Sequence, residues 1–146
     1  MKSFEQQMRA ISNKTLKQAA NYQKVIAGRV FAKVVARTPV GNPDLWDIPD
    51  SAYWNVIESG YKGGSLRAAW TLNQRDTGGD LNKFRSVVNT LADHQPIEIS
   101  NRMPYARAVE YGHSWQQAPS GMVRISVRET KAEMKARKNL TGIKLT

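Results

Sequence analysis

Ionisable and aromatic side chains gather between residues 101 and 127, in the segment "NRMPYARAVEYGHSWQQAPSGMVRISV". Glu110 has Tyr105, Tyr111 and His113 close to it in sequence, and these are residue types that general acid–base catalysis uses. Catalysis also requires the groups to lie within hydrogen-bond reach and to have adjusted pKa values, and closeness in sequence provides neither. We therefore expect Glu110 to bind backbone donors or an arginine, and the segment to be architectural.

Metal and cofactor chemistry is not indicated by any spacing in the chain. The two histidines, His94 and His113, do not form a paired ligand motif. Asp44, Asp47 and Asp50 recur at every third residue, but a calcium loop needs alternating ligands, a central glycine and a glutamate at its twelfth position. Turn formation and capping explain aspartates among prolines better. The sequence predicts no metal and no cofactor.

Other catalytic motifs are also missing from the sequence. The glycines of "YKGGSLR" are not followed by the lysine and hydroxyl residue of a phosphate-binding loop, and no nucleophile-elbow motif occurs. Cysteine is absent, which removes thiolate nucleophiles and disulfides and fits a reducing compartment. We expect the protein not to be an enzyme.

Charge is concentrated at the two ends of the chain, whose formal net charge is +10. Residues 1–37 contain eight basic residues and one acid, and residues 100–146 contain nine basic residues and three acids. Three interpretations stay open: nucleic-acid binding, contact with acidic protein partners, and a solvated basic face. No 18-residue apolar run and no apolar signal core occur, so we expect no membrane contact and no Sec export.

The N-terminal part of the chain predicts a long amphipathic helix over residues 13–37. Asn13 is the predicted N-cap, and the helix should end at Thr38 because Pro39 follows. Residues 3–11 form either a short preceding helix or a continuation, and residues 1–12 are expected to be flexible or partner-bound. The predicted apolar stripe consists of Leu16, Ala19, Ala20, Gln23, Ile26, Ala27, Val30 and Val34.

An irregular, aromatic-rich segment follows from Pro39 to Gly64. Its prolines and glycines exclude a continuous element, and its aromatic residues argue against simple disorder. We expect this loop to fold onto the body or onto a neighbouring subunit; the role of residues 41–63 stays open.

The remainder alternates strands and helices. We expect a strand over 65–75, a helix over 81–92 capped by Asp80, and a strand over 96–100. A short helix should follow over 104–111, with Pro104 in its first turn. Residues 119–138 should form a final helix, or a strand passing into one, and residues 139–146 a tail that is flexible or partner-bound. This order predicts a single α+β domain over residues 1–146, with a small, mostly antiparallel sheet packed against the long N-terminal helix and further helices.

Four blocks of sequence resemble a known family. They are Thr38-Pro39-Val40, Gly64 to Trp70, Asn101 to Gly112, and Ala118 to Arg124. Taken in order over about residues 13–130, they resemble the tail-completion or neck proteins of long-tailed phages, the head–tail joining components grouped with minor tail protein Z. The Asn101–Gly112 block is the most specific. The long insertion after Val40 departs from many relatives.

The resemblance implies a non-enzymatic virion protein that is assembled in the host cytoplasm and located at the neck. Such proteins form a ring, commonly of six copies, between the head connector or stopper and the tail terminator or tail tube. The genome DNA passes through the channel without sequence-specific contact. A basic DNA-binding module of phage or bacterial origin is the alternative function.

Aromatic residues and arginines are enriched in protein interfaces, and a ring needs two different contact patches on each subunit. The expected interface residues are Trp46, Trp54, Arg67, Trp70, Tyr105, Glu110, Tyr111 and Trp115. Within the opening segment, we expect Gly112 to have positive φ, Pro119 and Gly121 to set the start of the last helix, and Glu110 to bind backbone donors or an arginine such as Arg67 or Arg107.

Overall fold

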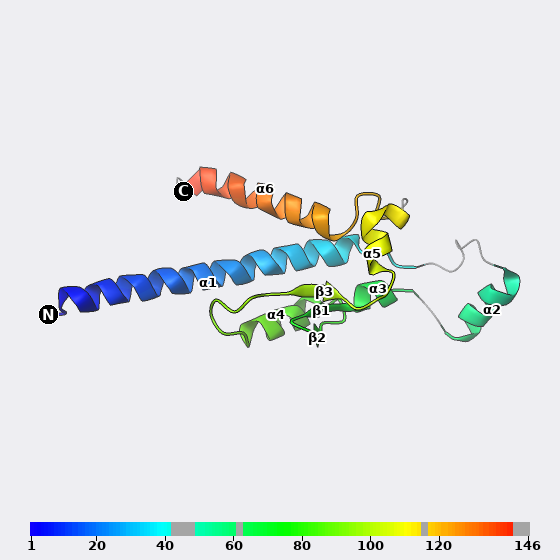
Figure 1. Cartoon of the computed structure of the whole chain (residues 1–146), viewed down its shortest axis with the longest axis horizontal. Helices are drawn as coiled ribbons and strands as arrows, with labels where there is room; N and C mark the ends of the chain where they lie inside the picture. The colour runs from blue at the N-terminus through cyan, green and yellow to red at the C-terminus, as the bar shows by residue number, and fades with distance from the viewer. Residues whose placement is uncertain (42–48, 61–62, 115–116, 142–146) are drawn as a thin grey trace.

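The computed structural model describes residues 1–41, 49–60, 63–114 and 117–141. Trp46, Tyr61 and Trp115 lie outside these residues, so the expectations for them stay predictions. The described part is α+β, with a long N-terminal helix and a small three-stranded antiparallel sheet, as predicted. Figure 1 shows the N-terminal helix between the sheet on one side and the C-terminal helix on the other.

The N-terminal helix α1 is continuous over Phe4–Arg37. Ser3 caps it in a capping box, in which the Ser3 hydroxyl accepts from the Gln6 backbone N–H and the Gln6 side chain accepts from the Ser3 N–H. The prediction of Asn13 as N-cap is therefore wrong, because a stronger capping pair lies ten residues earlier. The predicted end is confirmed: Thr38 is the C-cap and its N–H bonds to the Val35 carbonyl.

The sheet has β1 (Trp70–Leu72) in its centre, between β2 (Arg75–Asp76) and β3 (Ile99–Asn101). Both pairings are antiparallel, with Thr71 opposite Asp76 on one side and opposite Ser100 on the other. Asn73 and Gln74 turn the chain between β1 and β2 with positive φ values of 46° and 64°. Two such residues match the right-handed twist of a tight hairpin.

The prediction of one strand over 65–75 is wrong for its first half. Residues Ser65–Ala68 form the short helix α3, which begins after Gly64 at φ 89°. The apolar residues from Leu66 to Leu72 alternate as in a strand, but they also fit a helical spacing. Within residues 65–70 the buried residues are Leu66, Ala69 and Trp70, and Ala68 is exposed, which is the helical pattern.

The remaining helices are α2 (Asp50–Glu58), α4 (Leu81–Asn89), α5 (Ala106–Ala108), η2 (Val109–His113) and α6 (Val123–Thr141). α2 lies inside the segment predicted as irregular, and Figure 1 shows it beyond the C-terminal end of α1. Asp80 caps α4 as predicted, accepting from the Asn82 N–H at 2.7 Å. Pro104 precedes α5 rather than lying in its first turn. α6 begins at Val123, and residues 117–122, which lead into it, contain no strand.

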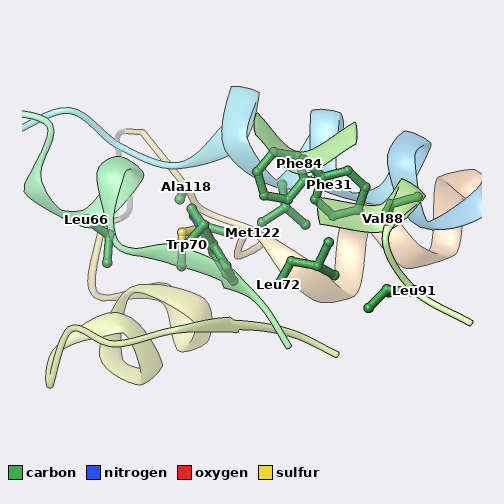
Figure 2. Close-up of a cluster of buried hydrophobic side chains, with 10 residues drawn as sticks. Phe31, Leu66, Trp70, Leu72, Phe84, Val88, Leu91, Ala118 and Met122 are labelled. Carbon is green, nitrogen blue, oxygen red and sulfur yellow. The ribbon is translucent and has the colours of Figure 1, made fainter. Parts of the chain in front are cut away.

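The hydrophobic core joins α1 to the sheet, α4 and the start of α6. Phe31 of α1 stacks on Phe84 of α4 with ring centroids 4.2 Å apart, and Figure 2 shows Met122 beside Trp70 in the same cluster. The predicted stripe on α1 is only partly correct, since Leu16 is 51 % exposed and the buried Phe31 was missed. α1 has two packing faces, so its apolar residues are spread too widely for a single stripe.

Candidate functional site: a corner built on Glu110

Glu110 lies on η2 and caps the N-terminus of α6 with its side chain. Its Oε2 accepts from the backbone N–H groups of Met122 at 2.6 Å and Val123 at 2.7 Å. Its Oε1 accepts from both the backbone N–H and the side-chain Nε of Arg124, each at 3.0 Å. The prediction that Glu110 binds backbone donors is confirmed, but the partner arginine is Arg124 and not Arg67 or Arg107.

The electrostatic setting of Glu110 favours the carboxylate. Burial raises the pKa of this side chain, which is only 12 % exposed. The N–H groups of Val123, Arg124 and Met122 and the Arg124 guanidinium stabilise the charge and together bring the pKa below its usual value. A general base needs a pKa near the working pH and free lone pairs, and Glu110 has neither, so its role here is structural.

Two glycines allow the chain to make this corner. Gly112 has a positive φ of 97°, as predicted, and departs from helical geometry inside η2. Gly121 has φ 80°, and a Cβ at that position would lie 2.4 Å from the Glu110 carbonyl oxygen and 2.8 Å from its Oε1. Any side chain at residue 121 would therefore push Glu110 away from the helix that it caps.

Exposed aromatic residues lie next to this cap. Tyr111 is 60 % exposed, and its ring has the Arg124 guanidinium 4.5 Å and the Arg107 guanidinium 5.9 Å from its centroid. Tyr105 is 43 % exposed. An aromatic ring between two cations suits contact with another protein surface, because it combines apolar area with charge at a low entropy cost.

A second cluster lies at the C-terminal end of α1. The Trp70 Nε1–H donates to Thr38 Oγ1 at 2.8 Å, Thr38 Oγ1 donates to the Val34 carbonyl at 2.7 Å, and Arg67 Nη2 donates to the Thr38 carbonyl at 2.9 Å. Trp70 is only 3 % exposed, so its side chain belongs to the core. Arg67 is half-buried, and its Nε is buried without a hydrogen-bond partner among the described residues.

The predicted interface residues therefore separate into three groups. Trp54 on α2, Tyr105 and Tyr111 are exposed; Arg67, Trp70 and Glu110 hold the fold together; Trp46 and Trp115 lie outside the described residues. Figure 1 shows α3, α5 and the beginning of α6 gathered at the C-terminal end of α1, so both clusters share one end of the molecule. Sequence reasoning missed the contact of Arg124 with Glu110 and that of Thr38 with Trp70, because both join residues distant in sequence.

Within the described residues, no group of three histidine, cysteine or acidic side chains could hold a metal ion, and no helix is long and apolar enough to cross a membrane. Comparison of the chain with family models, curated proteins and solved structures found no match. The likeness to phage neck proteins thus depends on the four sequence blocks alone.

Proposed function

We propose that this chain is a structural adaptor of the phage neck, which forms a ring and joins the DNA-filled head connector to the tail. The observation that carries the proposal is the link between the two most specific sequence blocks. The side chain of Glu110, from the Asn101–Gly112 block, accepts four hydrogen bonds from Met122, Val123 and Arg124 of the Ala118–Arg124 block. The residues that carry the resemblance thus build a hydrogen-bonded corner, which supports a structural role.

The surfaces around the corner fit an adaptor. A ring of identical subunits needs two different patches on each copy, and large exposed aromatic residues are the usual anchors of such patches. Trp54, Tyr105 and Tyr111 are exposed and provide candidate anchors. The partners under this proposal are further copies in a ring, six in number as in the family it resembles, together with the head connector or stopper and the tail terminator or tube.

The genome passes through the channel of such a ring, which restricts where the basic residues can lie. A dense belt of Lys and Arg along the wall would bind many phosphates and hold the DNA. Under this proposal, the basic ends of the chain therefore face neighbouring proteins and not the channel.

The experiment is complementation of particles that lack this protein with the Tyr105→Ala/Tyr111→Ala double variant. Filled heads and separate tails should accumulate in electron micrographs, because the anchors are lost while the Glu110 cap remains. Gln74→Ala, in the exposed hairpin turn, is the control and should give joined particles. Normal joining by the double variant at unchanged protein level would reject Tyr105 and Tyr111 as anchors, and a chain that never enters the particle would reject the neck function.

The competing function is a DNA-binding module, favoured by exposed basic residues along α6: Arg128, Lys131 and Lys135. It predicts a gel shift of duplex DNA at moderate salt and a steep fall in affinity as salt increases. Absence of a shift would reject this alternative and leave the adaptor standing.

A further inference from the structure

The two long helices α1 and α6 run antiparallel and are joined by ion pairs near the C-terminal end of α1. Lys33 of α1 pairs with Glu129 and Glu133, Arg37 pairs with Glu129 at 2.7 Å, and Arg29 approaches Glu133 at 3.7 Å. Toward the C-terminal end of α6 the two helices diverge (Figure 1).

A groove of about 470 Å³ lies where α1 and α6 separate. Its apolar lining comes from Tyr22, Ile26 and Val30 on α1 and from Val127 and Met134 on α6, and Lys131 and Lys135 also line it. Tyr22 Oη lies 3.1 Å from Met134 Sδ and is 47 % exposed, so it marks the open end of the groove.

The same face of α1 continues beyond the groove as an exposed stripe. Every residue from 1 to 19 is exposed. Phe4, Met8, Ile11, Tyr22 and Val25 are 79, 49, 61, 47 and 52 % exposed. Their spacing of three and four residues, with Thr15 and Gln18 between them, is the a/d pattern of a heptad repeat. We call these seven residues the α1 stripe: Phe4, Met8, Ile11, Thr15, Gln18, Tyr22 and Val25.

The pattern of the α1 stripe indicates a helix as its occupant. Residues 4–16 extend over about 20 Å as a helix in which every residue is exposed, and Lys17, which pairs with Asp93, is the next residue along it. A helix of this length is marginal in water without packing, and its apolar stripe is of the kind that marks an interaction site. Side chains that repeat as a and d fit into the spaces of a facing helix.

Charge identifies the kind of helix. Around the stripe, Glu5 is paired with Arg9, while Lys2 and Lys14 make no ion pair among the described residues. The two acids of α6, Glu129 and Glu133, are already used by α1, while Lys131 and Lys135 at the groove have no ion pair in the described part of the chain. A second copy of α1 would place like charges together, whereas an acidic helix would neutralise them.

We propose that the α1 stripe and the adjoining groove form a docking site for an acidic amphipathic helix of a different protein. Apolar side chains of that helix fill the space beside Ile11, Tyr22 and Ile26, and its carboxylates pair with Lys131, Lys135 and Lys14. The inference depends on α1 and α6 alone and does not require the neck function.

The test uses the full chain and a synthetic four-heptad peptide with leucine at a and d and glutamate at e and g. Binding is measured by fluorescence anisotropy, and a peptide with lysine in place of glutamate is the matched control. We expect the acidic peptide to bind at least tenfold more tightly than the basic one. Ile11→Glu should weaken binding at least tenfold, whereas Ala10→Glu, on another face of the same overhang, should leave it unchanged.

The charge contribution is tested with Lys131→Glu/Lys135→Glu, which should weaken binding of the acidic peptide at least fivefold. Lys83→Glu/Arg85→Glu on α4 changes the net charge equally and should have little effect beyond long-range screening. Circular dichroism of each variant shows whether α1 and α6 remain helical. If Ile11→Glu loses helicity, Met8→Glu replaces it as the test of the α1 stripe.

Three results would overturn the proposal. Equal binding of both peptides, or binding insensitive to Ile11→Glu, would show that the stripe does not select an acidic helix. A dimer in sedimentation that Ile11→Glu dissolves, without peptide binding, would assign the stripe to a second copy. Binding to phosphatidylserine vesicles that Ile11→Glu abolishes, without peptide binding, would assign it to an anionic membrane surface.

Discussion

Substitution of Glu110 by glutamine tests the corner most directly. The change keeps the size of the side chain but removes the charge, and it places an amide NH₂ group where a carboxylate oxygen accepts from backbone donors. Loss of one charge-assisted hydrogen bond costs about 2 kcal/mol, and loss of the favourable charge at the helix N-terminus costs about 1 kcal/mol. We expect Glu110→Gln to lower the free energy of unfolding by about 3 kcal/mol at neutral pH.

The assay is urea unfolding followed by circular dichroism. In thermal unfolding the same change lowers the midpoint by roughly 9 °C, at about 3 °C per kcal/mol for a domain of this size. Glu98→Gln is the control, because Glu98 is exposed and the structure gives its carboxylate no hydrogen bond or ion pair; it should change stability by less than about 0.5 kcal/mol.

The pH dependence gives an independent check. Because the pKa of Glu110 is lowered in the folded chain, its carboxylate stabilises the fold fully above the unfolded carboxyl pKa of about 4.3, and this stabilisation is lost as pH falls through the lower folded value. The difference between the original chain and Glu110→Gln should therefore shrink below about pH 4, while other carboxylates cancel in the comparison. Equal stability of the two proteins at neutral pH, or a difference that grows with acid, would refute the capping role.

Three further predictions address the surroundings of the corner and the helix pair. Gly121→Ala should destabilise the chain by about 3 kcal/mol in urea unfolding, since it combines positive φ with a clash on Glu110; Gly60→Ala, with positive φ and open space, should cost only about 1 kcal/mol. Trp70→Phe should cost about 1–2 kcal/mol by losing the bond to Thr38, and less in a Thr38→Val background if the two side chains are coupled. The side chains of Arg37 and Lys33 lower the pKa of Glu129, so acidification through that lowered pKa should reduce the protection of α6 amides against hydrogen exchange, relative to the intrinsic exchange rate at each pH, and Glu129→Gln should reduce it already at neutral pH.

Elements governed by neighbouring residues could be predicted from the sequence. The cap at Asp80 and the helical spacing of Leu81, Phe84 and Val88 lie within one segment, so α4 was predicted almost completely. The end of α1 depends on Thr38 and Pro39 alone. The start of α1 was missed because the Ser3–Gln6 capping box was not considered against Asn13.

The errors occur where distant contacts decide. Residues 65–68 satisfy a strand alternation. Leu66, Ala69 and Trp70 can all face the core, however, only if residues 65–68 form a helix. Similarly, the binding of Glu110 to some backbone donor could be expected, but Arg124 as its partner could not. The two residues are 14 positions apart and come together only because Gly112 and Gly121 turn the chain.

The two ends of the molecule differ in construction, and the difference bears on how it assembles. At the C-terminal end of α1, hydrogen bonds from Glu110 and Thr38 fix exposed aromatic residues on a rigid base. At the other end, α1 extends alone with an apolar, basic face. A rigid patch suits repeated contact with identical neighbours, because little order has to be gained on binding. An overhanging helix becomes fully ordered only against a partner, so under the proposed neck function it suits a contact made once, at the joining step.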